Sequence, residues 1–134
     1  MRSTEWEAFN IFDRIFANND ILGLALNAYT IRNEVIQHNI ANVDTPDFKK
    51  KVVDFERAFA AALDDSKRTG RLDIKRAEPK IRVINENFNY RLDGNNVDID
   101  LEMVDLYQNG VKYDVVTSSI INNYKKINLV VTGR

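Results

Sequence analysis

The first long run of apolar positions, from about Asp20 to Asn42, has a helical period. Asn18, Asn19 and Asp20 are candidate N-caps for this helix. Pro46 has no backbone N–H and biases Thr45 away from the helical conformation, so the helix should end near Asn42. We therefore predict an N-terminal helix with its stop motif over about residues 18–45. Its apolar face is formed by residues spaced three and four apart: Ile21, Leu24, Ala25, Ala28, Tyr29, Ile31, Val35 and Ile36.

Two polar residues interrupt this apolar face. On a helical wheel, Arg32 and Asn39 fall inside it, two turns apart, where solvent should be scarce. A polar group in such a place needs a partner, and in helix pairs it can fix the register. The alternative for Arg32 is that its guanidinium reaches solvent at the edge of the face.

A second helical pattern follows the turn signal at residues 93–96 and runs from about Asp100 to Val131. Asp98 and Asp100 are candidate N-caps, and Gly133 stands just past the last apolar residue, where a helix typically stops. We assign residues 97–134 to a C-terminal helix.

Counted in sevens, two rows of this helix form a coiled-coil seam. One row is Met103, Gly110, Thr117, Tyr124 and Val131. The other is Leu106, Tyr113, Ile120 and Ile127. The pattern predicts that the two long helices pair as a coiled-coil hairpin, with Leu106, Tyr113, Ile120, Tyr124 and Ile127 as packing residues.

A further set of apolar residues lies on another side of the same helix. A helix of about 30 residues is about 45 Å long, and one shorter partner cannot cover two of its faces. Either another molecule or the middle segment must cover the second face, and we favour self-association. The residues of this second apolar face are Val104, Tyr107, Val111, Val115 and Ile121.

The middle segment, residues 46–96, is mixed. Asp54 can cap a short helix that reaches about Leu63 and breaks over residues 64–70, and an exposed loop should follow over residues 71–79. Beyond the loop, alternating apolar residues predict a small β-hairpin. They are Ile81, Val83, Phe88, Tyr90 and Leu92. The predicted fold is thus mainly α, a single domain over residues 1–134.

Composition narrows the classes of function. The 134 residues carry a net charge of −1 and no cysteine. A near-neutral chain gives no overall attraction to nucleic acid, and the basic residues around Lys49 and Lys67 are diluted by acidic ones. No apolar run approaches the roughly 20 residues of a membrane span. The N-terminus lacks the apolar core of a cleavable signal, so we expect a chain that stays in the cytoplasm or leaves it without cleavage.

Signatures of catalysis are missing from the sequence. It has neither a glycine-rich phosphate loop nor metal-ligand spacing. His38 is the single histidine, and a lone histidine on a helix flank is typically structural. We expect a protein that is not an enzyme and that has no cofactor, no metal site and no nucleic-acid partner.

The two ends of the chain carry a family resemblance. Residues 39–56, NIANVDTPDFKKKVVDFE, resemble the N-I-A-N-x-x-T-P-G-Y/F-K signature of bacterial flagellar rod and hook proteins. Residues 94–103, GNNVDIDLEM, are similar to the G-N-x-V-D-x-D-x-E-M element that opens the C-terminal helix in that family. Both motifs together are more specific than either one. One departure is Asp47, where the family usually has glycine; if φ must be positive there, aspartate is costlier but tolerated.

Within this family the chain looks like a short member from the proximal rod. It has no room for the large β domains of the distal rod and hook proteins. It also lacks the Gly-Tyr-Val and Pro-Asn-Val type element of the short rod protein FlgC. An FlgC-like rod protein stays open as an alternative, as does a cytoplasmic coiled-coil adaptor, although an adaptor has no reason to carry both end motifs.

The resemblance implies a structural subunit that assembles helically in the proximal rod of the flagellar basal body, transmits motor torque and is required for motility. It implies export through the flagellar type III apparatus without a cleaved signal, and a final place in the rod within the periplasmic space. The implied partners are other copies of itself, FlgC and other rod proteins, FliE and the export gate. The implied assembly residues are Asn39, Ile40, Ala41, Asn42, Asp44, Thr45, Pro46, Phe48, Val97, Asp98, Glu102 and Met103.

Overall fold

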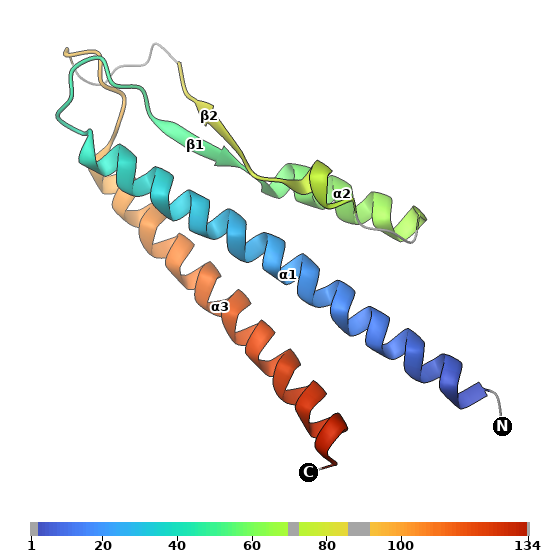
Figure 1. The fold of residues 1–134 in the computed structure, drawn as a ribbon. Helices are drawn as coiled ribbons and strands as arrows, with labels where there is room; N and C mark the ends of the chain where they lie inside the picture. The colour runs from blue at the N-terminus through green and yellow to red at the C-terminus, as the bar shows by residue number, and fades with distance from the viewer. Residues whose placement is uncertain (1–2, 70–72, 86–91, 134) are drawn as a thin grey trace.

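Two long antiparallel helices dominate the computed structural model, which describes residues 3–69, 73–85 and 92–133. Helix α1 spans Ser3–Ala41 and helix α3 spans Ile99–Thr132, and the two chain ends lie at the same end of this hairpin (Figure 1). Strand β1 (Lys51–Asp54), helix α2 (Glu56–Thr69), a 3₁₀ turn at Ile74–Ala77 and strand β2 (Lys80–Val83) lie along α1. The predicted mainly α hairpin with a small mixed middle segment is confirmed.

Helix α1 begins well before the predicted start. It runs from Ser3, whereas the sequence suggested a cap at Asn18, Asn19 or Asp20. Asn19 does not cap a helix, because its Oδ1 accepts a hydrogen bond from Asn123 of α3, 3.0 Å away. The C-terminal end at Ala41 agrees with the predicted stop.

The middle helix is also longer than predicted. Helix α2 does not break after Leu63 but continues to Thr69. Its extra turns carry opposite charges three residues apart, and the ion pairs Lys67–Asp64 at 3.0 Å and Arg68–Asp65 at 2.7 Å support the helical backbone. Part of the expected loop forms the 3₁₀ turn.

The described sheet joins β2 to a strand that the sequence did not suggest. A strand does form around Ile81 and Val83, but β2 pairs antiparallel with β1, with Val53 opposite Ile81. The other half of the expected hairpin, around Phe88 and Tyr90, lies outside the described residues. Strand β1 was missed because four residues are too few to show a period.

Both predicted caps of α3 are present. The Oδ1 of Asp98 accepts hydrogen bonds from the backbone N–H groups of Asp100 and Leu101, at 2.9 and 3.3 Å. At the other end Gly133 has φ 67°, and its N–H donates to the Leu129 carbonyl at 3.1 Å. These caps depend on local sequence alone, which is why they could be predicted.

The apolar core of the described residues lies between α1 and the middle segment, and the half-buried Val116 of α3 packs against it. Aromatic rings fill the space beneath β1: Phe55 stacks on Phe59 with ring centres 4.9 Å apart and meets the edge of Tyr29 at 6.5 Å. The buried members of this cluster are Leu24, Ala25, Ala28, Val35, Val53, Phe55, Ala62 and Ala77.

One of the two predicted seam rows of α3 turns only partly toward α1, since Gly110 and Thr117 are half-buried but Met103, Tyr124 and Val131 are exposed. Met103 and Tyr124 are 52% and 58% exposed, and the residues that face α1 lie one position earlier, in the row Glu102, Asn109, Val116 and Asn123. Apolar periodicity missed this row because three of its members are polar and find partners on α1. In the other row Leu106, Ile120 and Ile127 are half-buried, while Tyr113 is 38% exposed.

The bend between α1 and β1 packs against the bend before α3. Asp47, where the family has glycine, adopts φ 57°, and its N–H donates to the Asp93 carbonyl at 2.9 Å. Gly94 has φ 76°, and a Cβ at that position would lie 2.3 Å from Oδ1 of Asp47. Its φ favours glycine there, and a Cβ would in addition have to displace the end of the Asp47 side chain.

We expect Gly94→Ala to lower the free energy of unfolding by about 1–2 kcal/mol, because alanine disfavours a left-handed backbone and its Cβ would displace the Asp47 side chain. Urea unfolding followed by circular dichroism measures the change. The matched control is Gly23→Ala on the exposed side of α1, where nothing lies within 4 Å of the new Cβ. It should raise stability by up to about 1 kcal/mol. Equal effects of the two substitutions would contradict this account of the bend.

Candidate functional site

The two family motifs, about 50 residues apart in the sequence, meet at the closed end of the hairpin. Asn95 is fully buried there, and its Nδ2 lies within hydrogen-bond distance of the carbonyls of Asn42, Val43 and Thr45, at 2.9, 2.9 and 2.8 Å. Its Oδ1 accepts from the N–H of Val97 at 2.8 Å. These carbonyls lie in the turn that follows α1, so Asn95 holds this turn against the start of α3. The carbonyls of Asn42 and Thr45 also accept from the N–H groups of Thr45 and Phe48, at 3.1 and 3.4 Å.

Asn96 joins the ends of the two strands. Its Oδ1 accepts from the N–H of Lys50 at 2.6 Å, and its Nδ2 donates to the carbonyl of Ile84 at 2.9 Å. Adjacent asparagines thus hold different segments, Asn95 the turn after α1 and Asn96 the end of the sheet.

A third asparagine, Asn39, connects α1 with both β1 and α3. Its Oδ1 accepts from the N–H of Lys51 at 3.0 Å, and its Nδ2 donates to the Lys51 carbonyl at 2.8 Å. The same Nδ2 lies 3.0 Å from Oε2 of Glu102. Asn39 and Glu102 are both fully buried, so this is an amide–carboxylate contact shielded from water.

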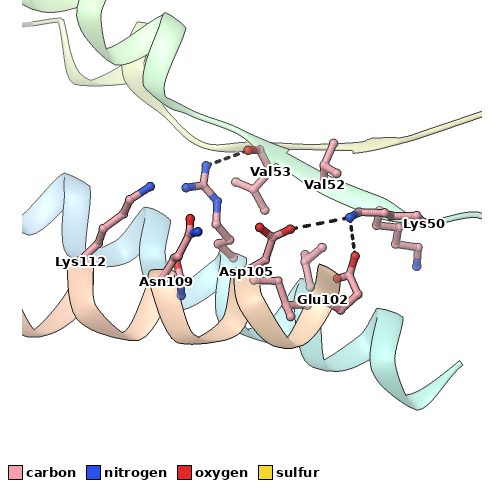
Figure 2. A pocket seen from close by; sticks show the side chains of 12 residues that line it. Lys50, Val52, Val53, Glu102, Asp105, Asn109 and Lys112 are labelled. Carbon is pink, nitrogen blue, oxygen red and sulfur yellow. Dashed lines mark hydrogen bonds and ion pairs between the residues drawn. The ribbon is translucent and has the colours of Figure 1, made fainter. Parts of the chain in front are cut away.

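The buried carboxylate of Glu102 is neutralised by Lys50. Figure 2 shows the Lys50 ammonium between Glu102 and Asp105 of α3, paired with Oε1 of Glu102 and 3.7 Å from Oδ2 of Asp105. A buried charge needs such a partner, because desolvation otherwise costs several kcal/mol. We call the set Lys50, Asn39, Asn95, Asn96 and Glu102 the clasp.

Beside the clasp, β1 and the two long helices enclose a cleft of about 230 Å³. On its α1 side Arg32 donates to the Val53 carbonyl at 3.0 Å and to Oε2 of Glu56 at 2.6 Å. This hydrogen bond lowers the pKa of the Glu56 carboxyl from its ordinary value and raises that of Arg32. Arg32 and Asn39, the two polar residues on the apolar face of α1, therefore both have partners. Each of them bonds backbone groups of β1.

The chemistry of this region is structural. Among the described residues, no group of three or more histidine, cysteine, aspartate or glutamate side chains is placed to hold a metal ion. Within the same ranges, no helix is both long and apolar enough to cross a membrane. The charged groups of the clasp and of Arg32 are engaged in pairs that hold secondary-structure elements together.

The predicted motif residues separate into an inner and an outer set. Asn39, Val97 and Glu102 are buried, and Asp98 caps α3. Ile40, Asn42 and Phe48 are half-buried; the Asn42 Nδ2 donates to the His38 carbonyl at 2.7 Å, and the Phe48 and His38 rings lie 5.6 Å apart. The outer, exposed set is Ala41, Asp44, Thr45, Pro46 and Met103.

Sequence reasoning missed Lys50, Asn95 and Asn96 as functional residues. It interpreted the two asparagines as a turn signal and Lys50 as part of a basic run. The available signal was their position inside or beside both quoted motifs. Their partners could not be found from periodicity, because each contacts a segment about 50 residues away.

Comparison with known proteins gives a consistent result. No family model matches the sequence. The chain is similar to the flagellar basal body rod protein FlgB of Borrelia hermsii, with 34% identity covering 91% of this chain and 98% of the relative. It is 32% identical to FlgB of Bacillus subtilis, covering 81% of this chain and 88% of that protein. FlgB of Borreliella burgdorferi is also 32% identical, over 78% of this chain and 88% of the relative.

Replacing the buried amide of Asn95 should strongly destabilise the chain. We expect Asn95→Ala to lower the free energy of unfolding by about 2–3 kcal/mol, because it removes a buried amide that bonds the turn after α1 and takes away the donor of the Val43 carbonyl. The control is Asn122→Ala on the exposed surface of α3, which should change it by less than about 0.5 kcal/mol. Chemical unfolding at neutral pH compares the two, and similar losses would show that Asn95 does not hold the bend.

The Arg32–Glu56 pair should make stability depend on acid. Because the folded pKa of Glu56 lies below its ordinary value of 4.5, the contribution of the pair is present above pH 4.5. It is lost as the pH falls through the folded pKa. We expect the stability difference between wild type and Glu56→Gln, below about 1 kcal/mol for this half-exposed pair, to shrink between pH 6 and 3, as measured by urea titration.

The control for this pH effect is the same substitution in an Arg32→Gln chain. Without the guanidinium, Glu56→Gln should give a difference that does not vary with pH over that range. A pH-dependent difference that survives in the Arg32→Gln chain would assign the effect to another group.

Proposed function

The chain belongs to the FlgB family of flagellar basal body rod proteins, and from this membership we propose which of its surfaces build the rod. It is a structural subunit of the basal body rod and acts in flagellum-dependent motility. A rod component associates with copies of itself and with other rod proteins. Relatives named FlgB over most of the chain favour this function over an FlgC-like protein or a cytoplasmic adaptor.

The main contact surface, in this proposal, is the outer side of α3. Five apolar side chains there are between 47% and 76% exposed, and the middle segment does not cover them, because it lies along α1. A contiguous apolar stripe on a soluble chain typically marks an interaction surface. This observation carries the proposal. The stripe consists of Val104, Tyr107, Val111, Val115 and Ile121.

A helical assembly accounts for a stripe on the outer side of an already paired helix. Head-to-tail contacts give each subunit neighbours on several sides, so α3 can pair with α1 on one side and with other subunits on another. The single domain, residues 1–134, would then stack as a proximal rod segment that transmits torque from the motor.

The neighbours at the two ends of this segment follow from its place in the rod. We assign FliE and the export gate to the base, and FlgC with the other rod proteins to the distal side. The subunit would reach the periplasmic space through the flagellar type III export apparatus, without a cleaved signal peptide.

The two sets of motif residues have different roles in this proposal. The buried and half-buried residues, among them Asn39, Val97 and Glu102, fix the geometry of the bend. The exposed residues Asp44, Thr45, Pro46 and Met103 contact adjacent subunits. The heptad residues Leu106, Tyr113, Ile120, Tyr124 and Ile127 pack either in the hairpin or, where exposed, against a neighbour.

Charges placed on the stripe should abolish rod assembly without unfolding the chain. Val111→Glu with Val115→Glu adds two carboxylates at exposed positions, so we expect helicity close to wild type by circular dichroism but loss of swimming in a complemented deletion strain. Deletion of residues 113–134 should have the same effect on swimming. The matched control is Asn27→Glu, an exposed position of α1, which should preserve it. Normal swimming by the double variant, with the chain present, would overturn the proposal.

A further inference from the structure

The inner side of α3 carries polar residues among its half-buried apolar ones. The side that faces α1 carries Glu102, Asn109 and Asn123, while the outer side carries valine, isoleucine and tyrosine. Three interhelical hydrogen bonds follow the inner side from the clasp toward the chain ends. After Glu102, the Nδ2 of Asn109 donates to the Tyr29 carbonyl at 2.9 Å, and the Nδ2 of Asn123 donates to Oδ1 of Asn19 at 3.0 Å.

Stability does not explain these asparagines. Oδ1 of Asn109 and Nδ2 of Asn19 are buried, and neither has a hydrogen-bond partner within the described part of the chain. Each amide is thus only partly satisfied, and apolar side chains would pack the same seam more favourably. A polar residue kept in a helix seam at such a cost typically selects one pairing over others.

We propose that Asn19, Asn109 and Asn123 are specificity-determining residues. They select the axial register and the rotational orientation in which α3 pairs with α1 of the same chain. Their role differs from that of the outer stripe, which meets other molecules in the proposed function. A helix that is apolar around much of its circumference can pair with α1 in several ways. Only the observed pairing provides the hydrogen bonds of Asn109 to Tyr29 and of Asn123 to Asn19.

Sliding of α3 by one heptad is opposed in both directions. In the inner row Val116 stands between Asn109 and Asn123, seven residues from each, and it packs against the cluster that includes Leu24 and Ala25. A slide either way moves one of the asparagines into the place of Val116. Its amide would then be buried against apolar side chains, while Val116 would face a polar partner.

Rotation of α3 is opposed by the same residues. Turning the row of Met103 and Tyr124 toward α1 would bury more apolar surface, but it would break the hydrogen bonds of Asn109 and Asn123. The clasp fixes only the first turn of α3. Asn109 and Asn123 lie about two and six turns beyond Glu102, so their hydrogen bonds fix the same register and rotation farther along the helix.

A distance measurement in the isolated chain tests this selection without any rod. The chain has no cysteine, so Asn27→Cys and Lys126→Cys, both at exposed positions, accept two spin labels without ambiguity. Double electron–electron resonance should give one distance for the otherwise wild-type chain. With Asn109→Val and Asn123→Val we expect additional distances, including a shift of about 10 Å along the axis for a one-heptad slide.

The matched control is Asn122→Val, which makes the same chemical change on the exposed side of α3 and should keep one distance. Asn19→Asp with Asn123→Lys supplies a different complementary polar pair and should also keep one distance. This rescue decides the question if the double valine variant loses its helicity.

The proposal is overturned if the helical double valine variant keeps the single wild-type distance, or if the Asp–Lys pair gives a mixture. It also fails if the wild-type asparagines already allow several distances. None of these results depends on rod assembly. Failure of the function proposed above would appear differently: the stripe variant would swim normally, and the spin-label distances would be unchanged.

Discussion

The contact between Asn39 and Glu102 is the interaction on which the rest of this structure depends. An amide and a carboxylate are both fully buried where α1, β1 and α3 meet, and every polar atom there must be matched inside the protein. Asn39 meets this requirement by bonding the backbone of β1 as well as Glu102, and Lys50 supplies the opposite charge. The three elements are therefore held by one polar network, while the apolar core forms a separate layer between α1 and the middle segment.

Much of the fold could be predicted because it depends on local sequence. The apolar period of residues 21–36 and the Thr45-Pro46 stop give the C-terminal half of α1, and Asp98 and Gly133 give both ends of α3. The seam of α3 could not be found in the same way, since Glu102, Asn109 and Asn123 interrupt its apolar row. Predicting that these side chains face inward requires knowledge of their partners, which lie on α1. The same limit applies to Asn95 and Asn96, whose turn-forming sequence gives no sign of the segments that they hold.

The distribution of polarity separates the two tasks of α3. Its inner side pairs with α1 through hydrogen bonds, which are stable only over a narrow range of distances and angles. Its outer side presents apolar surface, and the hydrophobic effect does not depend on the direction of contact. A rod subunit needs both properties, because its own hairpin must be unique while its neighbours change along the assembly. In the bend before β1, Asp47 adopts φ 57°, in the left-handed region that aspartate tolerates better than most residues.

The position of Asn95 has a consequence for the order in which the chain can fold. The turn after α1 obtains side-chain hydrogen bonds from a residue about 50 positions later, so this turn is fixed only when a long loop closes. The end of α1 itself is bonded locally, because the carbonyls of Asn39 and Ile40 accept from the N–H groups of Asn42 and Val43. A nascent chain that ends before Asn95 therefore holds nearly all of the apolar core residues and the bonds that close α1, but not those that fix the turn after it. Fixing of this turn and initiation of the last helix then coincide, because Asn95 and the Asp98 cap are separated by only two residues.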